Sequence, residues 1–197
     1  MALYTSSMVV RSTISLEGEY VMPLFNLIIS HEPGWYNTRL VLRLIKSLLP
    51  GVRIFDTPPS LVLAKTVNPF NDVLRLKKYI VEEQTPILRA IPLDDTCSPI
   101  LSKVKEKVHD IFFKKVPKNA SYAIRIEGHL YDDEWKRLHK IDAIKEIAKG
   151  ISNPVNLSKP DYLVLIKVVK AYRATRYACI MIAPPTYLIS RSKRYQP

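Results

Sequence analysis

Residues 119–185 read NASYAIRIEGHLYDDEWKRLHKIDAIKEIAKGISNPVNLSKPDYLVLIKVVKAYRATRYACIMIAPP, and the fold of the second half of the chain follows from this stretch. Its first large apolar residues, Tyr122, Ile124 and Ile126, stand at alternate positions, and Arg125 falls between them. Alternation of this kind is typical of a strand with one buried face and one solvated face. The stretch therefore opens with a predicted strand that carries Arg125 on its polar face.

A helical period follows this strand. The apolar residues that recur at helical spacing are Ile141, Ile144, Ile147, Ala148 and Ile151. Lysines lie off this stripe, as expected for an amphipathic helix that packs on a core. Two further apolar runs, residues 162–169 and 174–182, are rich in β-branched and aromatic residues, and only a short segment separates them. They predict an antiparallel pair of strands.

The order strand, helix, VNLSKPDYLVLIKVVK and a final apolar strand resembles the C-terminal part of a THUMP domain, an RNA-binding module of tRNA-modifying enzymes. The turn at residues 155–161, followed at once by a strand, is the most specific part of the match. Over roughly residues 24–188, the chain resembles the standalone THUMP proteins of the tRNA cytidine acetyltransferase adaptor family. That family usually carries a Gly-apolar-Ser triplet in its last strand, where this chain has Ala174-Thr175-Arg176. The family's serine therefore has no counterpart here.

The first half of the chain alternates between strand and helix patterns from residue 24 onward. Strands are predicted at residues 24–30, 52–55, 61–67 and 87–93, and helices around residues 40–48 and 68–84. Asn68-Pro69 marks the start of the second helix, because asparagine caps helices and proline suits their first turn. The order β-α-β-β-α-β is typical of a ferredoxin-like unit. The resemblance also implies such a unit ahead of a THUMP domain.

Ser98-Pro99 repeats the signal of a cap followed by proline and predicts a third helix, with apolar residues from Leu101 to Phe112 on one face. The linker at residues 94–98 is short and lacks glycine, so we expect the two units to pack against each other. The predicted fold class is α+β, with an N-terminal ferredoxin-like unit followed by an α/β THUMP domain. The predicted divisions are an extension at residues 1–23, a ferredoxin-like domain at 24–95, a THUMP domain at 96–190 and a basic tail at 191–197.

The charge of the chain is unevenly distributed. Thirty lysines and arginines against eighteen acidic residues give a net charge of +12, of which residues 98–197 carry +11 and residues 1–97 carry +1. This asymmetry favours a polyanionic partner on the second half of the chain. A solvated, lysine-rich surface is the plainer alternative.

Cysteine usage and hydropathy limit the setting in which we expect the protein to work. Cys97 and Cys179 are the two cysteines, and their wide spacing fits neither a disulfide framework nor a zinc knuckle, which predicts a reducing cytoplasm. No segment approaches the roughly 20 apolar residues that span a bilayer. We therefore expect a protein that has no membrane partner.

The sequence carries no motif for catalysis or for a cofactor. Its five glycines are never grouped as GxGxxG or GxxxxGK, which argues against sites for a methyl donor, ATP or acetyl-CoA. The four histidines lack metal-ligand spacing, and Asp132-Asp133-Glu134 is expected to be a solvated loop. We therefore predict no catalytic residue, no metal and no cofactor. An enzyme whose site the sequence hides is the alternative.

Three basic residues of the second half cluster at the start of the predicted middle helix. They are Lys136, Arg137 and Lys140. A helix start offers unpaired N–H groups and the positive end of the helix dipole, so cations there form a plausible phosphate site. Cations are mildly unfavourable for the helix itself, which weakens a purely structural explanation.

The turn between the last two predicted strands supplies a second group. Lys170, Arg173 and Arg176 lie at or just after this turn, and Tyr172 is the leading candidate for stacking on an unpaired base, since a hairpin tip can expose a ring. An exposed cation without any contact is the plainer alternative for each. The predicted RNA-binding residues are Arg125, Lys136, Arg137, Lys140, Lys170, Tyr172, Arg173 and Arg176.

Together these features predict a tRNA-binding adaptor that catalyses nothing alone. By resemblance, its partners are tRNA and a separate RNA cytidine acetyltransferase to which it presents a cytidine, rather than DNA or a membrane. Two alternatives stay open. One is a THUMP-like accessory subunit for another tRNA modification, such as thiolation or methylation. The other is a general RNA-binding protein.

Overall fold

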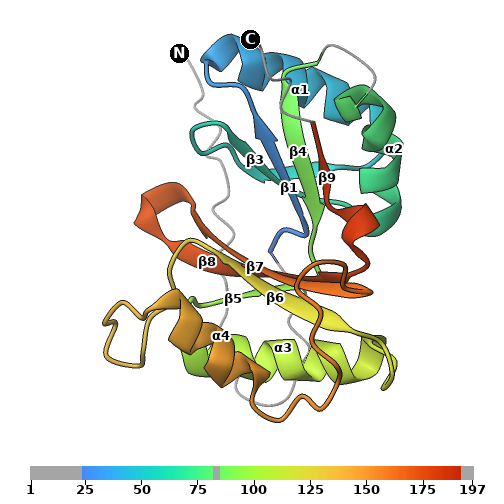
Figure 1. Cartoon of the computed structure of the whole chain (residues 1–197). Coiled ribbons are helices and arrows are strands. Elements are labelled where there is room, and N and C mark those ends of the chain that lie inside the picture. The colour runs from blue at the N-terminus through green and yellow to red at the C-terminus, as the bar shows by residue number, and fades with distance from the viewer. Residues whose placement is uncertain (1–23, 82–84, 192–197) are drawn as a thin grey trace, which may run out of the picture.

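The computed structural model describes residues 24–81 and 85–191. The predicted N-terminal extension, the end of the second predicted helix and residues 192–197 of the predicted basic tail lie outside the described residues. Figure 1 shows four layers, with a pair of helices, a sheet, a second sheet and a second pair of helices stacked in that order. The two sheets face each other, and each pair of helices covers the outer face of one sheet.

The first sheet belongs mainly to the first half of the chain. Its strands are β1 (Leu27–His31), β2 (Arg53–Asp56), β3 (Leu61–Lys65), β4 (Ile87–Pro92) and β9 (Ile189–Ser190). They run in the order β2-β3-β1-β4-β9, and every neighbouring pair is antiparallel. The helices α1 (Trp35–Leu48) and α2 (Pro69–Val81) connect β1 to β2 and β3 to β4. The predicted β-α-β-β-α-β order of a ferredoxin-like unit is confirmed.

The start of α2 follows the local chemistry that the sequence indicates. The side-chain oxygen of Asn68 accepts a hydrogen bond from the backbone N–H of Asn71 at 3.2 Å, and Pro69 is the first residue of the helix. This bond satisfies one of the N–H groups that a helix start leaves unpaired. The helix then buries Val73, Leu76 and Ile80 against the first sheet.

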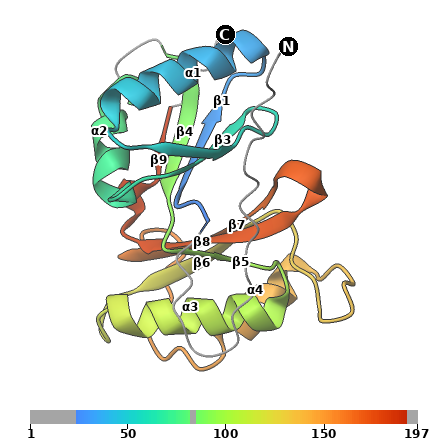
Figure 2. The ribbon, with the colours of Figure 1, turned by 180° about the vertical axis from the view of Figure 1, so that it is seen from behind.

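The second sheet forms the other half of the molecule. Its strands are β5 (Asp95–Cys97), β6 (Tyr122–Glu127), β7 (Tyr162–Lys170) and β8 (Arg176–Ala183), in the order β5-β8-β7-β6. β6 and β7 are parallel, whereas β8 is antiparallel to both β7 and β5. The helices α3 (Leu101–Lys115) and α4 (Lys140–Ala148) cover its outer face, and Figure 2 shows α3 from behind. Two short 3₁₀ turns follow β7 and β8, η1 (Tyr172–Ala174) and η2 (Pro185–Tyr187).

The prediction for the start of the third helix was wrong by a short distance. α3 begins at Leu101 after Ile100, which is extended and offers no side-chain cap. The reason is a pairing between distant segments. The N–H of Tyr131 donates to Pro99 O at 3.0 Å, and the N–H of Leu101 donates to Tyr131 O at 2.8 Å. This bridge holds the segment extended, so the Ser98-Pro99 signal precedes the helix without starting it.

Two other expectations need correction. Cys97, which falls in the predicted linker at residues 94–98, lies at the end of β5, because this segment pairs with β8. Ile141, predicted on the buried stripe of the middle helix, is 56% exposed, whereas Ile147 on the same stripe is fully buried. Ile141 lies in the first turn of the nine-residue helix α4, whose buried residues are Ala143 and Ile147.

Three cores hold these layers together. The middle core lies between the two sheets and includes Phe25, Ile28 and Ile91 from the first unit and Leu165 and Met181 from the second. The outer cores lie beneath α1 and α2 on one side and beneath α3 and α4 on the other. Face-to-face packing of two sheets removes both inner faces from water, which is the main force that favours burial. The two units are therefore packed rather than tethered.

The chain crosses between the two units at both ends of the second unit. β5 begins at Asp95, the predicted boundary, and already pairs with β8. At the other end, β9 joins the first sheet beside β4, and the N–H of Arg191 donates to Leu88 O at 2.8 Å. The guanidinium of Arg191 also lies 2.9 Å from a carboxylate oxygen of Glu32.

The turn at residues 155–161 has a structural role at the start of the second sheet. A carboxylate oxygen of Asp161 accepts hydrogen bonds from the backbone N–H of Ser121 at 2.8 Å and from its hydroxyl at 2.7 Å. These two bonds lower the pKa of Asp161, because they stabilise its charged form. Ser121 immediately precedes β6 and Asp161 immediately precedes β7, so the contact sets the parallel register of the two strands.

An ion cluster joins the two sheets at one side. Glu127 of β6 lies 2.7 Å from Arg89 of β4 and 2.9 Å from Lys167 of β7. Burial would raise the pKa of Glu127, but the hydrogen bonds from Lys167 and Arg89 outweigh it, and the net pKa is lowered. A carboxylate with a lowered pKa stabilises the folded state above its unfolded pKa and ceases to do so as the pH falls through its folded pKa.

We expect Glu127→Gln to lower the free energy of unfolding by about 2 kcal/mol at pH 7, because two partly buried cations lose their shared carboxylate. The difference from the parent should shrink as the pH falls below 4.5, the ordinary pKa of a glutamate. Urea denaturation from pH 3 to pH 7 measures it. Glu106→Gln is the control, since Glu106 pairs with Lys103 at 3.7 Å with both side chains exposed. A pH-independent difference between Glu127→Gln and the parent would contradict the prediction.

Candidate nucleic-acid interface

The candidate interface lies at the end of the second sheet where β6 stops and the β7–β8 hairpin turns. Gly128 follows β6 with a φ of +99°, a conformation that side chains rarely adopt. A Cβ at this position would come within 2.9 Å of the Cβ of Val168 in β7. The glycine therefore lets the chain leave the sheet against β7, and it starts the loop of residues 128–139.

This loop is held by its own hydrogen bonds. The carboxylate of Asp132 accepts the N–H groups of Glu134 at 3.0 Å and of Lys136 at 2.8 Å. The N–H of Leu138 donates to the carbonyl of Leu130 at 2.9 Å, and the Leu130 side chain is buried. The carboxylate cluster predicted as a solvated loop thus also shapes its own turn, an arrangement common for aspartate in loops. The backbone on which the loop cations stand is therefore well defined.

Two predicted cations lie side by side at the start of α4. Lys140 is the first residue of the helix, and Arg137 and Lys140 line one shallow depression together with His129 and His139. Desolvation and then the charges of Arg137 and Lys140 lower the pKa of His129, which favours the neutral form of its imidazole. Cations close enough to repel a proton from a neighbour create a local field that attracts an anion. The depression is therefore suited to a phosphate group.

Arg176, at the start of β8, extends the basic surface toward the hairpin. Its guanidinium carbon lies 5.8 Å from the centre of the Tyr131 ring, and Tyr131 pairs with Arg137 across the loop. The Trp135 ring lies 5.5 Å from the Tyr131 ring and is 52% exposed. Exposed rings beside arginines offer stacking surfaces for bases as well as charge for phosphates.

The hairpin tip carries the remaining predicted residues. Lys170 lies opposite Arg176 in the β7–β8 register, and Arg173 lies within η1. Tyr172 is 72% exposed, as predicted for a residue at a hairpin tip. Its backbone N–H donates to a carboxylate oxygen of Asp56 in β2 at 2.6 Å. In both ribbon views the hairpin projects from the end of the second sheet toward the first, and this bond ties it to the first unit.

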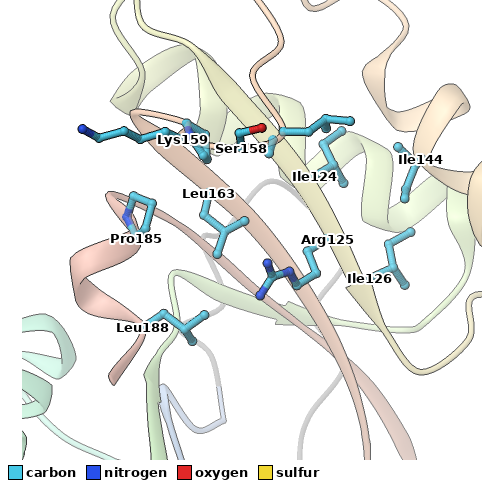
Figure 3. A pocket seen from close by; sticks show the side chains of 12 residues that line it. Ile124, Arg125, Ile126, Ile144, Ser158, Lys159, Leu163, Pro185 and Leu188 are labelled. Atoms are coloured by element: carbon cyan, nitrogen blue, oxygen red, sulfur yellow. The ribbon is translucent and has the colours of Figure 1, made fainter. Parts of the chain in front are cut away.

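Two predicted residues have other surroundings. The Nζ of Lys136 lies 2.6 Å from a carboxylate oxygen of Glu134, and both side chains are highly exposed. Arg125 faces the groove beside β6 shown in Figure 3. Arg125 is level with Leu165 in β7, and Lys170 lies five residues further along that strand. At about 3.3 Å per residue this is a separation of roughly 16 Å. The structure thus sets Arg125 apart from the cluster at the hairpin end.

Much of the positive charge of α3 is already paired. Lys105 lies 2.8 Å from Glu146 of α4, Lys107 lies 3.0 Å from Asp95, and Lys115 contacts Asp94 at 2.7 Å. These pairs attach the helix to its neighbours. The positive charge of α3 is therefore less available to bind an anionic ligand than the positive charge at the hairpin end.

Reactive groups are scarce in the described part of the chain. Burial, followed by the charge of Asp95, raises the pKa of the Cys97 thiol to about 12, so it stays protonated at neutral pH. Burial also raises the pKa of Cys179. Within residues 24–81 and 85–191, no group of three or more metal-binding side chains gathers at one point. None of the helices in these ranges combines the length and the apolar character needed to cross a bilayer.

Comparison with known proteins finds the same fold in several solved structures. The chain aligns with PH1313 from Pyrococcus horikoshii at a TM-score of 0.55 and 12% identity, over 81% of this chain and 55% of that one. It aligns with TrmN from Thermus thermophilus at a TM-score of 0.52 and 14% identity, over 79% and 44% of the two chains. The fold is that of THUMP-domain proteins. This likeness, at such low identity, concerns the fold alone.

A third THUMP-type structure is a 4-thiouridine synthetase in complex with RNA and bound ATP. It matches at a TM-score of 0.50 and 13% identity, over 81% of this chain and 42% of that one. The chain thus spans about half the length of these three structures. Neither a protein-family model nor a curated protein sequence matches it.

The THUMP-type fold also presents an aromatic and basic surface that the sequence analysis missed. Trp35 and Tyr36 begin α1 with exposures of 71% and 62%. The guanidinium carbon of Arg39 lies 5.5 Å from the centre of the Trp35 ring. The signal was present in the sequence, since both rings fall before the buried stripe of Val41 and Ile45 and so have no place in the core.

Proposed function

We propose that this protein binds tRNA at the hairpin end of its second unit and acts as a non-catalytic adaptor that presents tRNA to a separate acetyltransferase for cytidine acetylation. The observation that carries RNA binding is the convergence of Arg137, Lys140 and Arg176 beside the exposed ring of Trp135. Phosphates would lie on the cations, and an unpaired base could stack on an exposed ring. The capture of RNA by a 4-thiouridine synthetase with this fold supports RNA as the ligand.

The contact between hairpin and first unit adds a geometric reason for RNA. The bond from Tyr172 to Asp56 fixes the hairpin relative to the first sheet. A surface with fixed spacing suits a ligand that is itself rigid, and folded RNA is recognised largely by shape and backbone. The exposed rings of Trp35 and Tyr36 give the first unit a second place where such a ligand could touch.

The adaptor role and the absence of catalysis rest on different support. The sequence resembles the adaptor family of tRNA cytidine acetylation and carries no motif for acetyl-CoA or ATP. The raised pKa of the Cys97 thiol argues against that residue as a nucleophile. Recognition and chemistry would then be divided between two polypeptides.

The binding of tRNA should weaken steeply with salt. If about five phosphates are contacted, the logarithm of the association constant should fall against the logarithm of salt concentration with a slope near −4. Fluorescence anisotropy with a labelled tRNA between 50 mM and 300 mM salt measures the slope. An affinity that does not change with salt, or no binding at low salt, would contradict the proposal that the protein binds tRNA.

The cellular test is deletion of the gene, followed by mass spectrometry of tRNA nucleosides. We expect 4-acetylcytidine to disappear from a subset of tRNAs, and the purified protein with acetyl-CoA, ATP and tRNA to form no product. An accessory subunit for thiolation is the second candidate, favoured by the fold shared with the 4-thiouridine synthetase. Loss of a thiolated nucleoside with acetylation intact would select this second candidate.

A further inference from the structure

The outer edge of β6 is only partly covered. β6 is the last strand of the second sheet, and β7 lies on its other side. At the start of the outer edge, the N–H of Tyr122 donates to Pro154 O at 2.9 Å, and the N–H of Asn156 donates to Tyr122 O at 3.0 Å. Alternate residues of a strand direct their backbone groups to the same edge, so Ile124 and Ile126 also face outward. Among the described residues, neither has a backbone hydrogen-bond partner across that edge.

The segment that covers Tyr122 turns away before it reaches these two residues. The side-chain oxygen of Asn156 accepts the N–H groups of Ser158 at 3.1 Å and Lys159 at 3.0 Å. This turn directs the chain off the sheet toward Asp161. On its outer edge, β6 is thus paired at Tyr122 and is not paired at Ile124 and Ile126. Exposed strand edges of this kind are the usual templates for an added strand.

A groove of about 510 Å³ lies along this part of β6. Figure 3 shows Ile124, Ile126 and Ile144 of α4 on one side, and Leu163, Pro185 and Leu188 on the other. Leu157 also lines the groove and is 80% exposed. The lining is therefore mainly apolar, and part of it is in contact with water. Added strands bind edges through the main chain and gain specificity from side-chain pockets of this type.

The charged residues of the groove are both cations, Arg125 and Lys159, and its lining includes no acidic and no aromatic residue. Figure 3 places Arg125 on the opposite side of β6 from Ile124 and Ile126. Because side chains alternate along a strand, an added segment would direct every second residue toward α4 and the residues between them toward Arg125. Apolar residues suit the first side, and acidic residues suit the second.

We propose that the outer edge of β6 binds an extended segment of a partner protein in which apolar residues alternate with acidic ones. Charge complementarity selects the acidic residues, and the open backbone groups of Ile124 and Ile126 select a strand. A single-stranded RNA fits this groove poorly, because the lining of the groove includes no aromatic ring on which a base could stack. The inference deepens the adaptor role, on which it rests for the existence of a partner protein, and it assigns protein binding and RNA binding to different surfaces.

The test uses the full chain labelled with nitrogen-15 and a capped seven-residue peptide of alternating valine and glutamate. We expect this peptide to slow amide hydrogen exchange at Ile124 and Ile126 by about tenfold or more at saturation, because both N–H groups become bonded. A peptide of alternating valine and lysine should bind roughly tenfold more weakly, since two attractive charge contacts become repulsive. The valine–glutamate peptide N-methylated at every residue should not bind and so should give no protection, because it has no N–H to donate to the carbonyls of Ile124 and Ile126.

Two variants separate the groove from the RNA surface. Leu157→Ser removes an exposed apolar side chain without changing charge, so peptide binding should weaken about fivefold while tRNA affinity stays that of the parent. Arg125→Glu should remove the preference, so that the two peptides bind about equally, because the new carboxylate offsets the charge of Lys159. If the parent protein binds the valine–glutamate peptide but does not bind tRNA, the proposed tRNA-binding function is wrong, whereas the peptide site on β6 is retained.

Three results would overturn the inference. The first is no protection of Ile124 and Ile126 by the valine–glutamate peptide at millimolar concentration. The second is equal binding of the glutamate and lysine peptides, because the partner would then not be acidic. The third is protection of the same two amides by a single-stranded RNA, which would assign the groove to RNA.

Discussion

Replacing Arg137, Lys140 and Arg176 together by glutamate is expected to weaken tRNA binding roughly 100-fold or more at 0.1 M salt. The three cations surround one end of the second sheet, with Arg137 and Lys140 in one depression and Arg176 over the Tyr131 ring. If each contacts one phosphate, the slope of the logarithm of affinity against the logarithm of salt should become shallower by about 2.5. Fluorescence anisotropy measures both quantities, and the thermal melt reports whether the variant is folded.

The chain offers a control with the same change of charge. Lys103, Lys114 and Lys118 are exposed on or just after α3, and replacing them by glutamate also removes six units of positive charge. Lys103 lies 3.7 Å from Glu106, but both side chains are exposed, so a glutamate there costs little. Lys105 and Lys107 would make a poor control, because a glutamate there would face the less exposed Glu146 or Asp95 and destabilise the helix packing. The control should bind tRNA at most about tenfold more weakly than the parent. Equal losses in both triple variants would indicate non-specific attraction by net charge and no defined site.

The same RNA-site variant also tests the adaptor role in the cell. If the hairpin end binds tRNA, the triple variant should fail to restore 4-acetylcytidine in a strain that lacks the gene, whereas the α3 control should restore it. This comparison needs no knowledge of which tRNA is bound. If both variants restore 4-acetylcytidine, the cellular role does not depend on the candidate interface.

The sequence predicted the local structure well wherever one period dominates. The helix predicted around residues 40–48 and the cap at Asn68 depend on residues a few positions apart, and both are present in the structure. The alternation at Tyr122 and Ile126 assigned those side chains to one face of β6, and both pack beneath α3 and α4. These features arise from bonds and contacts within one element, so a single stretch of sequence contains what determines them.

Features that depend on distant partners could not be predicted in this way. The extended conformation of Ile100 is due to the backbone of Tyr131, and β9 forms because β4 offers an edge to residues almost a hundred positions away. The face-to-face packing of the two sheets, with Phe25 against Tyr177, likewise needs both units. Hydrophobic patterning shows that a face is buried, but it does not show which other face covers it.

The candidate site illustrates the same limit. Arg137 and Lys140 are near in sequence and at a helix start, so their proximity could be anticipated. The distance of Arg125 from this cluster could not be anticipated. The alternation of a strand predicts which face of the sheet a side chain is on, but it does not predict how far that side chain lies from the loop of residues 128–139. Arg176 reaches the cluster through Tyr131, a contact between segments that no spacing rule connects. The position of the loop that carries Arg137 depends on one glycine at the end of β6.

That glycine carries the second large expected effect. Gly128→Ala should lower the free energy of unfolding by about 3 kcal/mol and the melting temperature by roughly 8 °C. Two causes add. The backbone at φ +99° is unfavourable for any residue with a Cβ, and the new methyl group would come within 2.9 Å of the Val168 Cβ. That Cβ is fixed to the backbone of β7, so it cannot move aside as the end of a flexible side chain can.

Gly51→Ala is the matched control, since Gly51 also has a positive φ, +75°, but a Cβ there would meet no atom within 4 Å. It should cost only about 1 kcal/mol, which is the backbone cost alone. The difference between the two variants in urea denaturation therefore isolates the contact between Gly128 and β7. Because Gly128 is the point from which the loop of Arg137 departs, tRNA affinity of the folded Gly128→Ala protein should also fall, whereas that of Gly51→Ala should not. Equal destabilisation by the two alanines would mean that the loop can shift away from β7 at no cost, and the cations it carries would then have no fixed position.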